Sequence, residues 1–503
     1  SLVDVVQSLI IKIENNEHNI FLELFREESL KLAVKIDKKI KNKTAGKLAG
    51  LVVGIKDNIC YKNHKVSAAS KILNNFHSTY SATVVDRLIN EDAIIIGRIN
   101  CDEFAMGSTN ENSAYGSVKN PLNPLLTPGG SSGGCAAAIS AKLCHITLGS
   151  DTGGSVRQPA AFCGVIGLKP SYGMISRHGL IAYASSFDQI GPLGNSTYDI
   201  DKVMEIICGR DDFDSTCVFS RHDYKKEFSP INKMRISIIK EVTNHSLIHP
   251  QVKKSFELLI SNIKKAGHEI NFVEMPILKY LVPSYYVLTT AEASSNLARY
   301  DGIKYGFSER VNIDNWEELV RKTRSKGFGP EVKRRILLGS FVLSEGYYDD
   351  YYTKAQKVRR IVSEQTNKIL GESDFILMPT SPTVPFKLNE EYNDPTVLYL
   401  QDVFTVQANL SGCPSLSIPI HKFKTDAPVG AQLITKKSFD KKLLLYGQKI
   451  LNNQVSSQIN SILRKVVING TASLSDVDGY EVGGKTGTCL LYTSPSPRDQ
   501  RGS

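Results

Sequence analysis

The spacing of apolar residues predicts helices and buried strands in alternation along most of the chain. Some segments carry apolar positions at helical intervals, and others are short apolar runs bounded by turn residues. The predicted elements are helices at 1–40 and 250–270, a helix followed by a strand at 82–100, and buried strands at 48–60, 234–242, 375–385 and 410–420. This alternation is typical of a sheet with helices on its faces.

The composition favours one large globular domain. The chain has 503 residues, of which 41% are hydrophobic and 22% charged, which is enough apolar material for a large core. No internal repeat and no long linker rich in Pro, Gly or Ser divides the first 450 residues. One large α/β domain is therefore the most economical interpretation.

Simple features of the sequence disfavour several classes of protein. The sequence contains no apolar run of eighteen or more residues, so a membrane-spanning helix is not expected. The first residues also lack the pattern of a secretory signal. The nine cysteines are scattered, without C-x-x-C or a paired Cys/His spacing. We therefore expect reduced thiols, no metal site, no membrane association and a cytoplasmic location.

The net charge of +10 comes from 61 Lys and Arg against 51 Asp and Glu, a modest excess for this length. Much of the excess lies in residues 31–47, where apolar residues are interleaved with lysines. This pattern favours a solvated helix face over a nucleic-acid contact. The charge alone therefore identifies no partner.

The C-terminal stretch differs from the rest of the chain. Residues 461–488 contain K-T-G within "GYEVGGKTGT", which resembles the strand motif of penicillin-binding transpeptidases. The S-D-N motif of those enzymes is missing, and S-N-I-K at 261–264 lies in a lysine-rich helical pattern, where we take it as chance. Residues 489–503 look like adapter-derived sequence. We therefore expect 455–503 to be a foreign or disordered tail outside the functional fold.

Two clusters rich in glycine and serine carry the candidate chemistry. They read "TPGGSSGGCAAAI" (127–139) and "LGSDTGGSVRQPA" (148–160). Each is short and is followed by small apolar residues, which disfavours a flexible linker. Neither matches G-x-x-x-x-G-K-[ST] or a strand followed by G-x-G-x-x-G, so phosphate binding is disfavoured. The serines themselves are the remaining candidates.

Ser155 is placed like a nucleophile, because the glycines before it let backbone amides approach a substrate carbonyl. A serine hydroxyl needs a base, and no histidine lies in a comparable setting. Lys56 directly follows an apolar strand and is the candidate base. Its amine can accept a proton only if burial or a nearby cation lowers its pKa.

Taken together, these segments resemble the amidase signature family. The resemblance rests on "VVGIKDNI", "GGSSGG" and "GSDTGGSVRQPAAFCGVIGLKPSYG". It implies an α/β fold in which a single domain over residues 1–454 has a central mixed twisted β-sheet covered by helices on both faces.

The same resemblance implies a Ser-cisSer-Lys triad. Lys56 matches the family's base, Ser131 the bridging serine that follows a cis bond, and Ser155 the nucleophile. The oxyanion hole would be formed by the backbone amides of Thr152, Gly153, Gly154 and Ser155. Cys135 stands where serine or another small residue is expected, and we expect no loss of activity from it.

Further segments resemble the A subunits of tRNA-dependent amidotransferases, namely 101–116, 285–306, 327–360 and 402–419. The residues that match that family's glutamine contacts are Arg335 for the α-carboxylate, Asp402 for the ammonium and Tyr286 as a polar wall. Arginine suits a carboxylate because its fork can bind both oxygens. Without the resemblance, Arg335 would be interpreted as a solvated helix charge, Asp402 as a helix cap and Tyr286 as a core aromatic.

The function implied by this resemblance is glutamine hydrolysis that supplies ammonia to a partner. In the family, the misacylated Glu-tRNA(Gln) is bound by the B subunit, which activates its glutamyl group with ATP and Mg²⁺, while the complex is braced by a small C subunit. The resemblance thus predicts free glutamine as substrate, amidotransferase subunits B and C as partners, tRNA contact mainly through B, and no cofactor bound by this chain. It leaves open whether Asp-tRNA(Asn) is served as well.

Three alternatives remain open at the level of sequence. The same triad would serve a stand-alone amidase that acts on small carboxamides. A catalytically silent scaffold would only assemble with partners, although the intact set of Lys56, Ser131 and Ser155 argues against it. A transpeptidase activity would have to reside in the tail.

Overall fold

The computed structural model describes residues 1–450 except 227, 229–230, 312, 391–395, 422–426 and 448. Contacts between residues divide the chain into two units, Ser1–Gln448 and Lys449–Ser503. Every element described below belongs to the first unit, and the predicted tail at 455–503 lies outside the described residues. None of the helices in the described ranges has the length and apolar character needed to cross a membrane.

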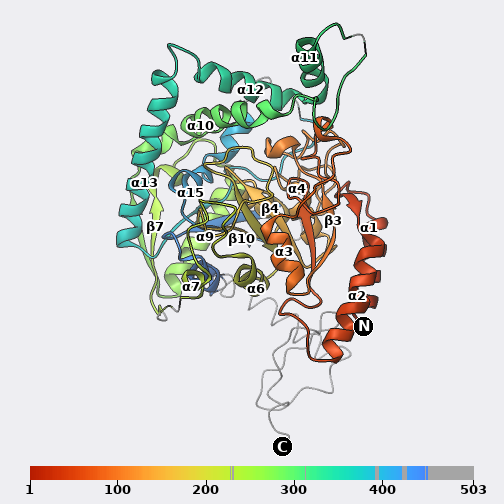
Figure 1. Cartoon of the computed structure of the whole chain (residues 1–503). Helices are drawn as coiled ribbons and strands as arrows, with labels where there is room; N and C mark the ends of the chain where they lie inside the picture. The colour runs from red at the N-terminus through yellow and green to blue at the C-terminus, as the bar shows by residue number, and fades with distance from the viewer. Residues whose placement is uncertain are drawn as a thin grey trace, which may run out of the picture. The chain divides into compact units, whose positions relative to one another are not determined.

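One mixed β-sheet forms the centre of this unit (Figure 1). Its strands in the described residues are β1 (Phe21–Leu24), β2 (Val52–Lys56), β3 (Ile94–Ile99), β4 (Ile146–Asp151), β5 (Ile166–Lys169), β6 (Gln189–Gly194), β7 (Arg235–Ile239), β8 (Glu269–Val273), β9 (Phe375–Pro379), β10 (Ser415–His421) and β11 (Val429–Ile434). Their order across the sheet is β1-β3-β2-β4-β6-β5-β10-β11-β9-β7-β8. Strand β2 pairs in parallel with β3 and β4, whereas β4 and β6 are antiparallel, which confirms the predicted mixed sheet.

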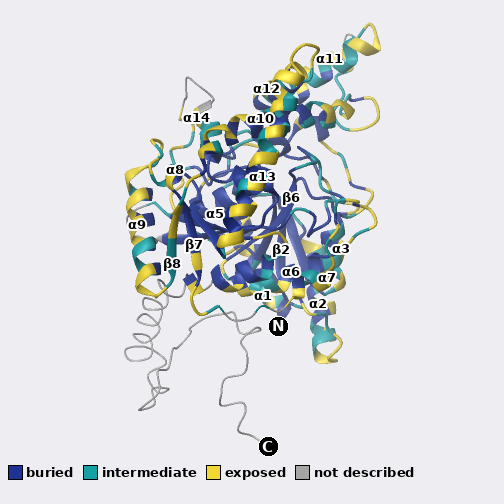
Figure 2. Ribbon diagram, turned by 90° about the vertical axis from the view of Figure 1, so that its left-hand side faces the viewer, coloured by how far each residue is buried: buried dark blue, intermediate teal, exposed yellow. Residues whose placement is uncertain are grey.

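Helices flank the sheet, whose strands are mostly buried, and many exposed residues lie on these helices (Figure 2). They are α1 (Leu2–Glu14), α2 (Arg26–Lys41), α3 (Thr83–Asn90), α4 (Gly133–Ser140), α5 (Arg157–Cys163), α6 (Thr197–Ile207), α7 (Arg221–Lys225), α8 (Lys240–Thr243), α9 (Pro250–Lys265), α10 (Leu281–Asn296), α11 (Trp316–Gly327), α12 (Pro330–Val342), α13 (Lys354–Glu372), α14 (Thr396–Tyr399) and α15 (Val406–Ser411). One apolar core joins α1, α2 and α4 to β2 and β3. Another joins α10, α12, α13 and α15.

Most of the predicted elements are present close to their expected positions. The segment at 82–100 forms α3 and β3, the apolar run at 48–60 forms β2, and β2 ends at Lys56 as expected. The amphipathic helix α9 ends just before Gly267, whose φ is +84°. This left-handed conformation suits a glycine after a helix C-terminus.

The helical periodicity over residues 1–40 corresponds to two helices, α1 and α2, and it did not reveal the segment between them. Between α1 and α2 the chain forms the short edge strand β1, which pairs antiparallel with β3. A strand of four residues shows too little alternation to be recognised between two amphipathic helices.

Candidate active site

The predicted catalytic residues lie where two adjacent parallel strands end. Strand β2 ends at Lys56, its parallel neighbour β4 ends at Asp151, and the carboxyl ends of parallel strands open on the same edge of a sheet. The peptide bond between Gly130 and Ser131 is cis, as expected, and lies just before α4. Both glycine–serine clusters converge on this edge of the sheet.

The amine of Lys56 is buried among serine hydroxyls. Its Nζ lies 2.7 Å from Ser131 Oγ, 2.9 Å from Ser132 Oγ and 3.0 Å from Ser150 Oγ. The side chain is fully buried, and burial lowers the pKa of Lys56, although nearby acidic groups act in the opposite direction. The structure therefore provides the condition under which a lysine can act as a base.

Ser132 and Ser150 are partners of Lys56 that the sequence analysis missed. Ser132 Oγ donates to the carbonyl of Ser150 at 3.0 Å, and Ser150 Oγ accepts from Asn58 Nδ2 at 2.9 Å. Both serines stand in the quoted motifs, as the second serine of "GGSSGG" and the first of "GSDTGGS". Motif spacing alone did not reveal that their side chains point to the same amine.

Ser155 is the half-buried member of the predicted triad. It lies in the turn between β4 and α5, and its carbonyl accepts a hydrogen bond from the amide of Ser132 at 3.1 Å. In the described part of the chain, the Ser155 hydroxyl has no hydrogen-bond partner, so the expected contact with Ser131 Oγ is not among the hydrogen bonds of this structure. Ser155 is thus less buried than Lys56 and Ser131, which are both fully buried.

The predicted oxyanion hole lies in residues 152–155, here called the oxyanion loop. Among the described residues, no acceptor engages the amides of Thr152, Gly153 and Ser155, so these donors have no protein partner. The amide of Gly154 instead donates to Asp151 Oδ1 at 2.9 Å. Three of the four predicted donors are therefore without an acceptor among the described residues, and the amide of Gly154 is engaged within the loop.

A buried ion pair supports the oxyanion loop. Arg157 donates through Nε and Nη2 to Asp151, at 3.0 Å in each case, and both side chains are fully buried. Burial would raise the pKa of Asp151, but the charge and hydrogen bonds of Arg157 outweigh it and lower the pKa to about 2. Arg157 also donates to the carbonyl of Thr405 and to the side chains of Gln432 and Asn409. The loop thus rests on a charged network that stays ionised.

Two glycines in the oxyanion loop make room for neighbouring side chains. A Cβ on Gly153 would lie 2.4 Å from the Tyr285 hydroxyl, and a Cβ on Gly154 would lie 2.3 Å from Thr405 Oγ1. Gly154 also has a φ of +139°, which residues with a side chain rarely adopt. Glycine is therefore required here by packing as well as by access to a substrate.

Arg335, Asp402 and Tyr286 form one buried cluster, here called the head site. The Tyr286 hydroxyl donates to Asp402 Oδ2 at 3.0 Å, and the Arg335 guanidinium carbon lies 5.2 Å from the centre of the Tyr286 ring. Arg335 is the inward member of the K-R-R run, because Lys333 and Arg334 are exposed. Arg335 and Asp402 thus both contact Tyr286. A free amino acid carries a carboxylate that could pair with the arginine and an ammonium that could pair with the aspartate.

Other side chains that the sequence analysis missed surround Arg335. Its Nε donates to Glu331 Oε1 and its Nη1 donates to the Tyr183 hydroxyl, both at 2.8 Å. The Tyr399 hydroxyl donates to Glu331, and the Tyr399 ring stacks on Tyr286 with centroids 4.1 Å apart. The spacing of Glu331 and Arg335 is a readable helix pair. The two tyrosines come from distant segments, and nothing in their local sequence marks them.

Two other reactive groups near these segments, Cys135 and His145, are unsuited to the role of Lys56 or Ser155. Cys135 is fully buried, and burial raises its pKa to about 12, so its thiol stays protonated. His145 Nδ1 is occupied by the amide of Val52 at 3.0 Å. The S-N-I-K segment lies within α9. Within the described ranges, no three His, Cys, Asp or Glu residues are grouped so as to hold a metal ion.

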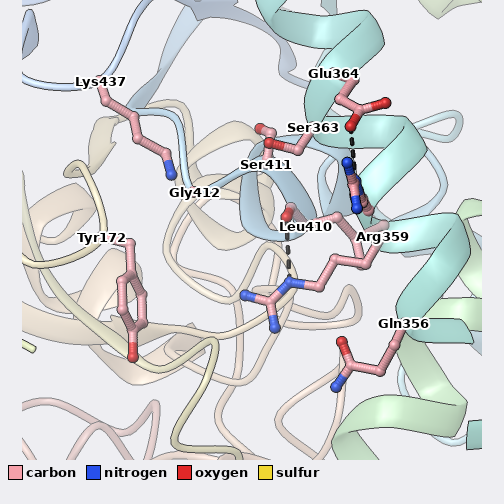
Figure 3. A pocket seen from close by; sticks show the side chains of 10 residues that line it. Tyr172, Gln356, Arg359, Ser363, Glu364, Leu410, Ser411, Gly412 and Lys437 are labelled. Carbon is pink, nitrogen blue, oxygen red and sulfur yellow. Dashed lines mark hydrogen bonds and ion pairs between the residues drawn. The ribbon is translucent and has the colours of Figure 1, made fainter. Parts of the chain in front are cut away.

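A separate pocket of about 440 Å³ lies between α13 and the end of α15 (Figure 3). Arg359 projects from α13 and donates to the carbonyls of Leu410 and Ser186, at 3.3 Å and 3.0 Å. Its guanidinium carbon also lies 4.2 Å from the centre of the Phe187 ring. These contacts connect α13 to α15 and to the segment before β6. Arg359 therefore has a structural role in joining these elements.

Comparison with known proteins identifies the family. The family model described as Amidase matches residues 4–444. The chain is 48% identical over 429 residues to the A subunit of the glutamyl-tRNA(Gln) amidotransferase of Koribacter versatilis, and the match covers 85% of this chain and 89% of that protein. It is 47% identical over 395 residues to the protein of the same name from Pelagibacter ubique, with 78% and 81% covered.

Solved structures support the same assignment. The crystal structure of the A subunit of glutamyl-tRNA(Gln) amidotransferase from Thermotoga maritima matches with a TM-score of 0.71 and 38% identity, over 88% of this chain and 90% of that chain. A peptide amidase from Stenotrophomonas maltophilia shares the fold, with a TM-score of 0.73 and 24% identity over 89% and 93%. Since the family model spans most of the sequence, including Lys56, Ser131 and Ser155, this chain belongs to the amidase signature family.

Proposed function

We propose that this chain is the glutaminase subunit of a tRNA-dependent amidotransferase. It hydrolyses glutamine and supplies the ammonia that converts Glu-tRNA(Gln) to Gln-tRNA(Gln). The relatives from Koribacter versatilis and Pelagibacter ubique carry the name of this enzyme's A subunit. The observation that carries the proposal is the head site, where buried Arg335 and buried Asp402 both contact Tyr286.

Free glutamine fits the head site by charge. Its α-carboxylate would pair with Arg335, whose fork can bind both carboxylate oxygens, and its ammonium would pair with Asp402. The side-chain amide would then extend to the oxyanion loop, where Gly153 packs against Tyr285, the neighbour of Tyr286. A small carboxamide carries neither a carboxylate nor an ammonium, so it would gain no electrostatic stabilisation from Arg335 and Asp402.

In the proposed mechanism, the first half of the reaction forms a γ-glutamyl ester. Ser155 Oγ attacks the amide carbon while its proton passes through Ser131 to neutral Lys56. The carbonyl oxygen becomes an oxyanion, which the open amides of the oxyanion loop stabilise. The C–N bond breaks, the leaving nitrogen takes the proton back along the same route, and ammonia departs.

Water completes the cycle. It attacks the ester carbon and gives its proton to Lys56 through Ser131, and a second tetrahedral oxyanion forms at the same amides. The bond to Ser155 breaks, and Ser155 Oγ recovers the proton. Glutamate is released, and Lys56 ends the cycle neutral.

The proposal includes partner subunits and a cytoplasmic location. The misacylated Glu-tRNA(Gln) would be bound by the B subunit, which would activate its glutamyl group with ATP and Mg²⁺, and the C subunit would brace the complex. This chain would contribute the ammonia and bind no cofactor. Asp-tRNA(Asn) would be a second acceptor wherever the same B subunit recognises it.

Co-expression with candidate B and C subunits tests the proposal. Ammonia release from glutamine is measured for the chain alone and for the complex, with and without ATP, Mg²⁺ and Glu-tRNA(Gln). We expect the complete complex to release ammonia about tenfold faster than the chain alone. If the partners leave the rate unchanged and small carboxamides react as fast as glutamine, the chain is a stand-alone amidase instead.

The affinity for glutamine should depend on pH through Asp402. Burial raises the pKa of Asp402 to about 7, although the hydrogen bond from Tyr286 and the charge of Arg335 act in the opposite direction. Only the ionised carboxylate attracts an ammonium, so glutamine binding should weaken about tenfold per pH unit below about 7. Calorimetric titration of the inactive Ser155→Ala protein between about pH 5 and pH 8 measures binding without turnover.

Asp402→Asn should abolish this pH dependence and weaken glutamine binding about 10- to 100-fold, since a hydrogen bond to a charged group contributes about 1.5–3 kcal/mol. Asp350→Asn is the control, because Asp350 is exposed and, among the described residues, its ion pair is with Lys354 on the surface. Its binding curve should overlay that of the parent protein. A curve for Asp402→Asn that keeps the same acid limb would assign the titration to another group.

A further inference from the structure

Two connections of buried hydrogen bonds join the head site to the oxyanion loop. One runs from Arg335 to Thr152, and the other runs from Asp402 to Gly153. No member of the predicted triad takes part in either connection. The residues between the two sites therefore have contacts that the catalytic mechanism does not yet explain.

The first connection passes through Tyr183 and Asp188. The Tyr183 hydroxyl accepts from Arg335 Nη1 at 2.8 Å, and the Tyr183 amide donates to Asp188 Oδ2 at 2.9 Å. The other carboxylate oxygen of Asp188 accepts from Thr152 Oγ1 at 2.6 Å. All four residues are buried. Asp188 thus links Tyr183, which contacts Arg335, to Thr152, the first residue of the oxyanion loop.

The second connection passes through Thr405. Its amide donates to the carbonyl of Asp402 at 3.0 Å, and its hydroxyl donates to the carbonyl of Gly153 at 2.5 Å. The same hydroxyl lies 3.1 Å from the Asp402 carbonyl. Because a hydroxyl has a single proton, it can serve the oxyanion loop or the backbone of the head site, but not both at once. Gly154 packs against the same side chain.

We propose that Thr405 and Asp188 are positioning residues that couple recognition of the amino-acid head to the geometry of the oxyanion loop. The inference rests on the proposed function, because it needs a substrate that carries both head charges. The substrate's α-carboxylate would bind Arg335, and its ammonium would bind Asp402. Through Asp188 and Thr405, these two contacts would affect the position of the oxyanion loop. Binding energy from the non-reacting head then orients the donors at the reacting carbonyl, which raises kcat rather than only lowering KM.

Thr405→Val tests the second connection, because it removes the hydroxyl and keeps the branched shape of the side chain. We expect kcat for glutamine to fall about 10- to 100-fold, while KM changes less than about twofold, since a displaced oxyanion donor acts mainly on the transition state. Thr405→Ser restores the hydroxyl and should recover most of the rate. Equal losses in the Val and Ser variants would contradict the proposed role of the hydroxyl.

A second substrate separates coupling from general damage to the fold. Butanamide carries a reacting amide but no charged head. If the head drives the loop, Thr405→Val should lower the rate on glutamine at least about tenfold more than the rate on butanamide. A structural defect would lower both rates by the same factor, and this result would overturn the inference. If butanamide turnover is too slow to measure, the kcat and KM values of Thr405→Val and Thr405→Ser for glutamine decide whether the hydroxyl has the proposed role.

Asp188→Asn tests the first connection. Its amide group has one oxygen, so it cannot accept from both Thr152 and the Tyr183 amide as the carboxylate does. We expect the same loss in kcat with little change in KM.

A double variant tests whether Thr405 acts through the head site. In an Asp402→Asn background, Thr405→Val should lower kcat by a smaller factor than it does in the wild type, because the effects of coupled residues are not additive. Full additivity would show that Thr405 does not act through the head site.

Thr366→Val is the matched control for these variants. Thr366 is a fully buried threonine on α13 whose hydroxyl accepts from Gln407 Nε2 at 3.1 Å, and it has no hydrogen bond to the oxyanion loop. Its kcat should stay within about twofold of the wild type, and melting temperatures within a few degrees identify folded variants. An inactive wild type would refute the proposed function. An active wild type whose Thr405→Val variant keeps its kcat would refute only this inference.

Discussion

Ser155→Ala is expected to lower kcat for glutamine hydrolysis by about 10⁴-fold or more, because the nucleophile of the proposed ester is lost while binding at the head site remains. Ammonia release measures the rate directly. Hydroxylamine gives a second measurement, since it intercepts a γ-glutamyl ester as the hydroxamate. We expect hydroxamate from the wild type and none above background from the variant.

Ser176→Ala is a suitable control for this experiment. Ser176 is a fully buried serine whose hydroxyl donates to Asp211, and it takes no part in the proposed chemistry. It should retain a kcat within about twofold of the wild type. Hydroxamate formation by the Ser155→Ala protein at the wild-type rate would assign the nucleophile to a different residue.

Lys56→Met is expected to lower kcat about 10³-fold, because it removes the base and keeps a side chain of similar length. The wild-type rate should also depend on pH through this amine. The protonated amine cannot accept a proton, so kcat should rise with pH and level off above the pKa of Lys56. Since burial lowers the pKa of Lys56, the midpoint should lie below 10.5, the ordinary value for lysine.

Lys169 provides the control for that pH profile, since it is a second fully buried lysine that the mechanism does not use. Burial, together with the charge of Arg157, lowers the pKa of Lys169 to about 8, and its Nζ donates to the carbonyl of Pro170. Lys169→Met should keep the acid limb of the wild type. Loss of that limb in Lys169→Met, with no change in Lys56→Met, would identify Lys169 as the titrating group.

The catalytic centre could be located from sequence because its chemistry lies in short contiguous motifs. Lys56 ends an apolar strand, and Ser131 and Ser155 stand in glycine-rich turns, so each position is marked locally. Their proximity follows from the parallel pairing of β2 and β4. The order of the strands could not be predicted in the same way, since it depends on pairing between segments far apart in the chain.

The supporting contacts were less predictable, because they join segments distant in sequence. Asp188 and Thr405 resemble ordinary polar residues in their local context, yet both hydrogen-bond to the oxyanion loop. The role of Gly153 and Gly154 was only partly predicted. Sequence reasoning assigned them to substrate access, whereas the structure also requires them for close packing against two neighbouring side chains.

The three hydroxyls around Lys56 determine how it can hold and release a proton. An ammonium group has three N–H bonds, and each can point at one of the oxygens of Ser131, Ser132 and Ser150. A neutral amine has two hydrogens and a lone pair, so one hydroxyl must turn around and donate to the nitrogen. The hydroxyl of Ser132 is already committed to a carbonyl, which leaves Ser131 or Ser150. Every turnover would therefore include the reversal of a single O–H dipole, and the transferred proton would be held directly by oxygen lone pairs.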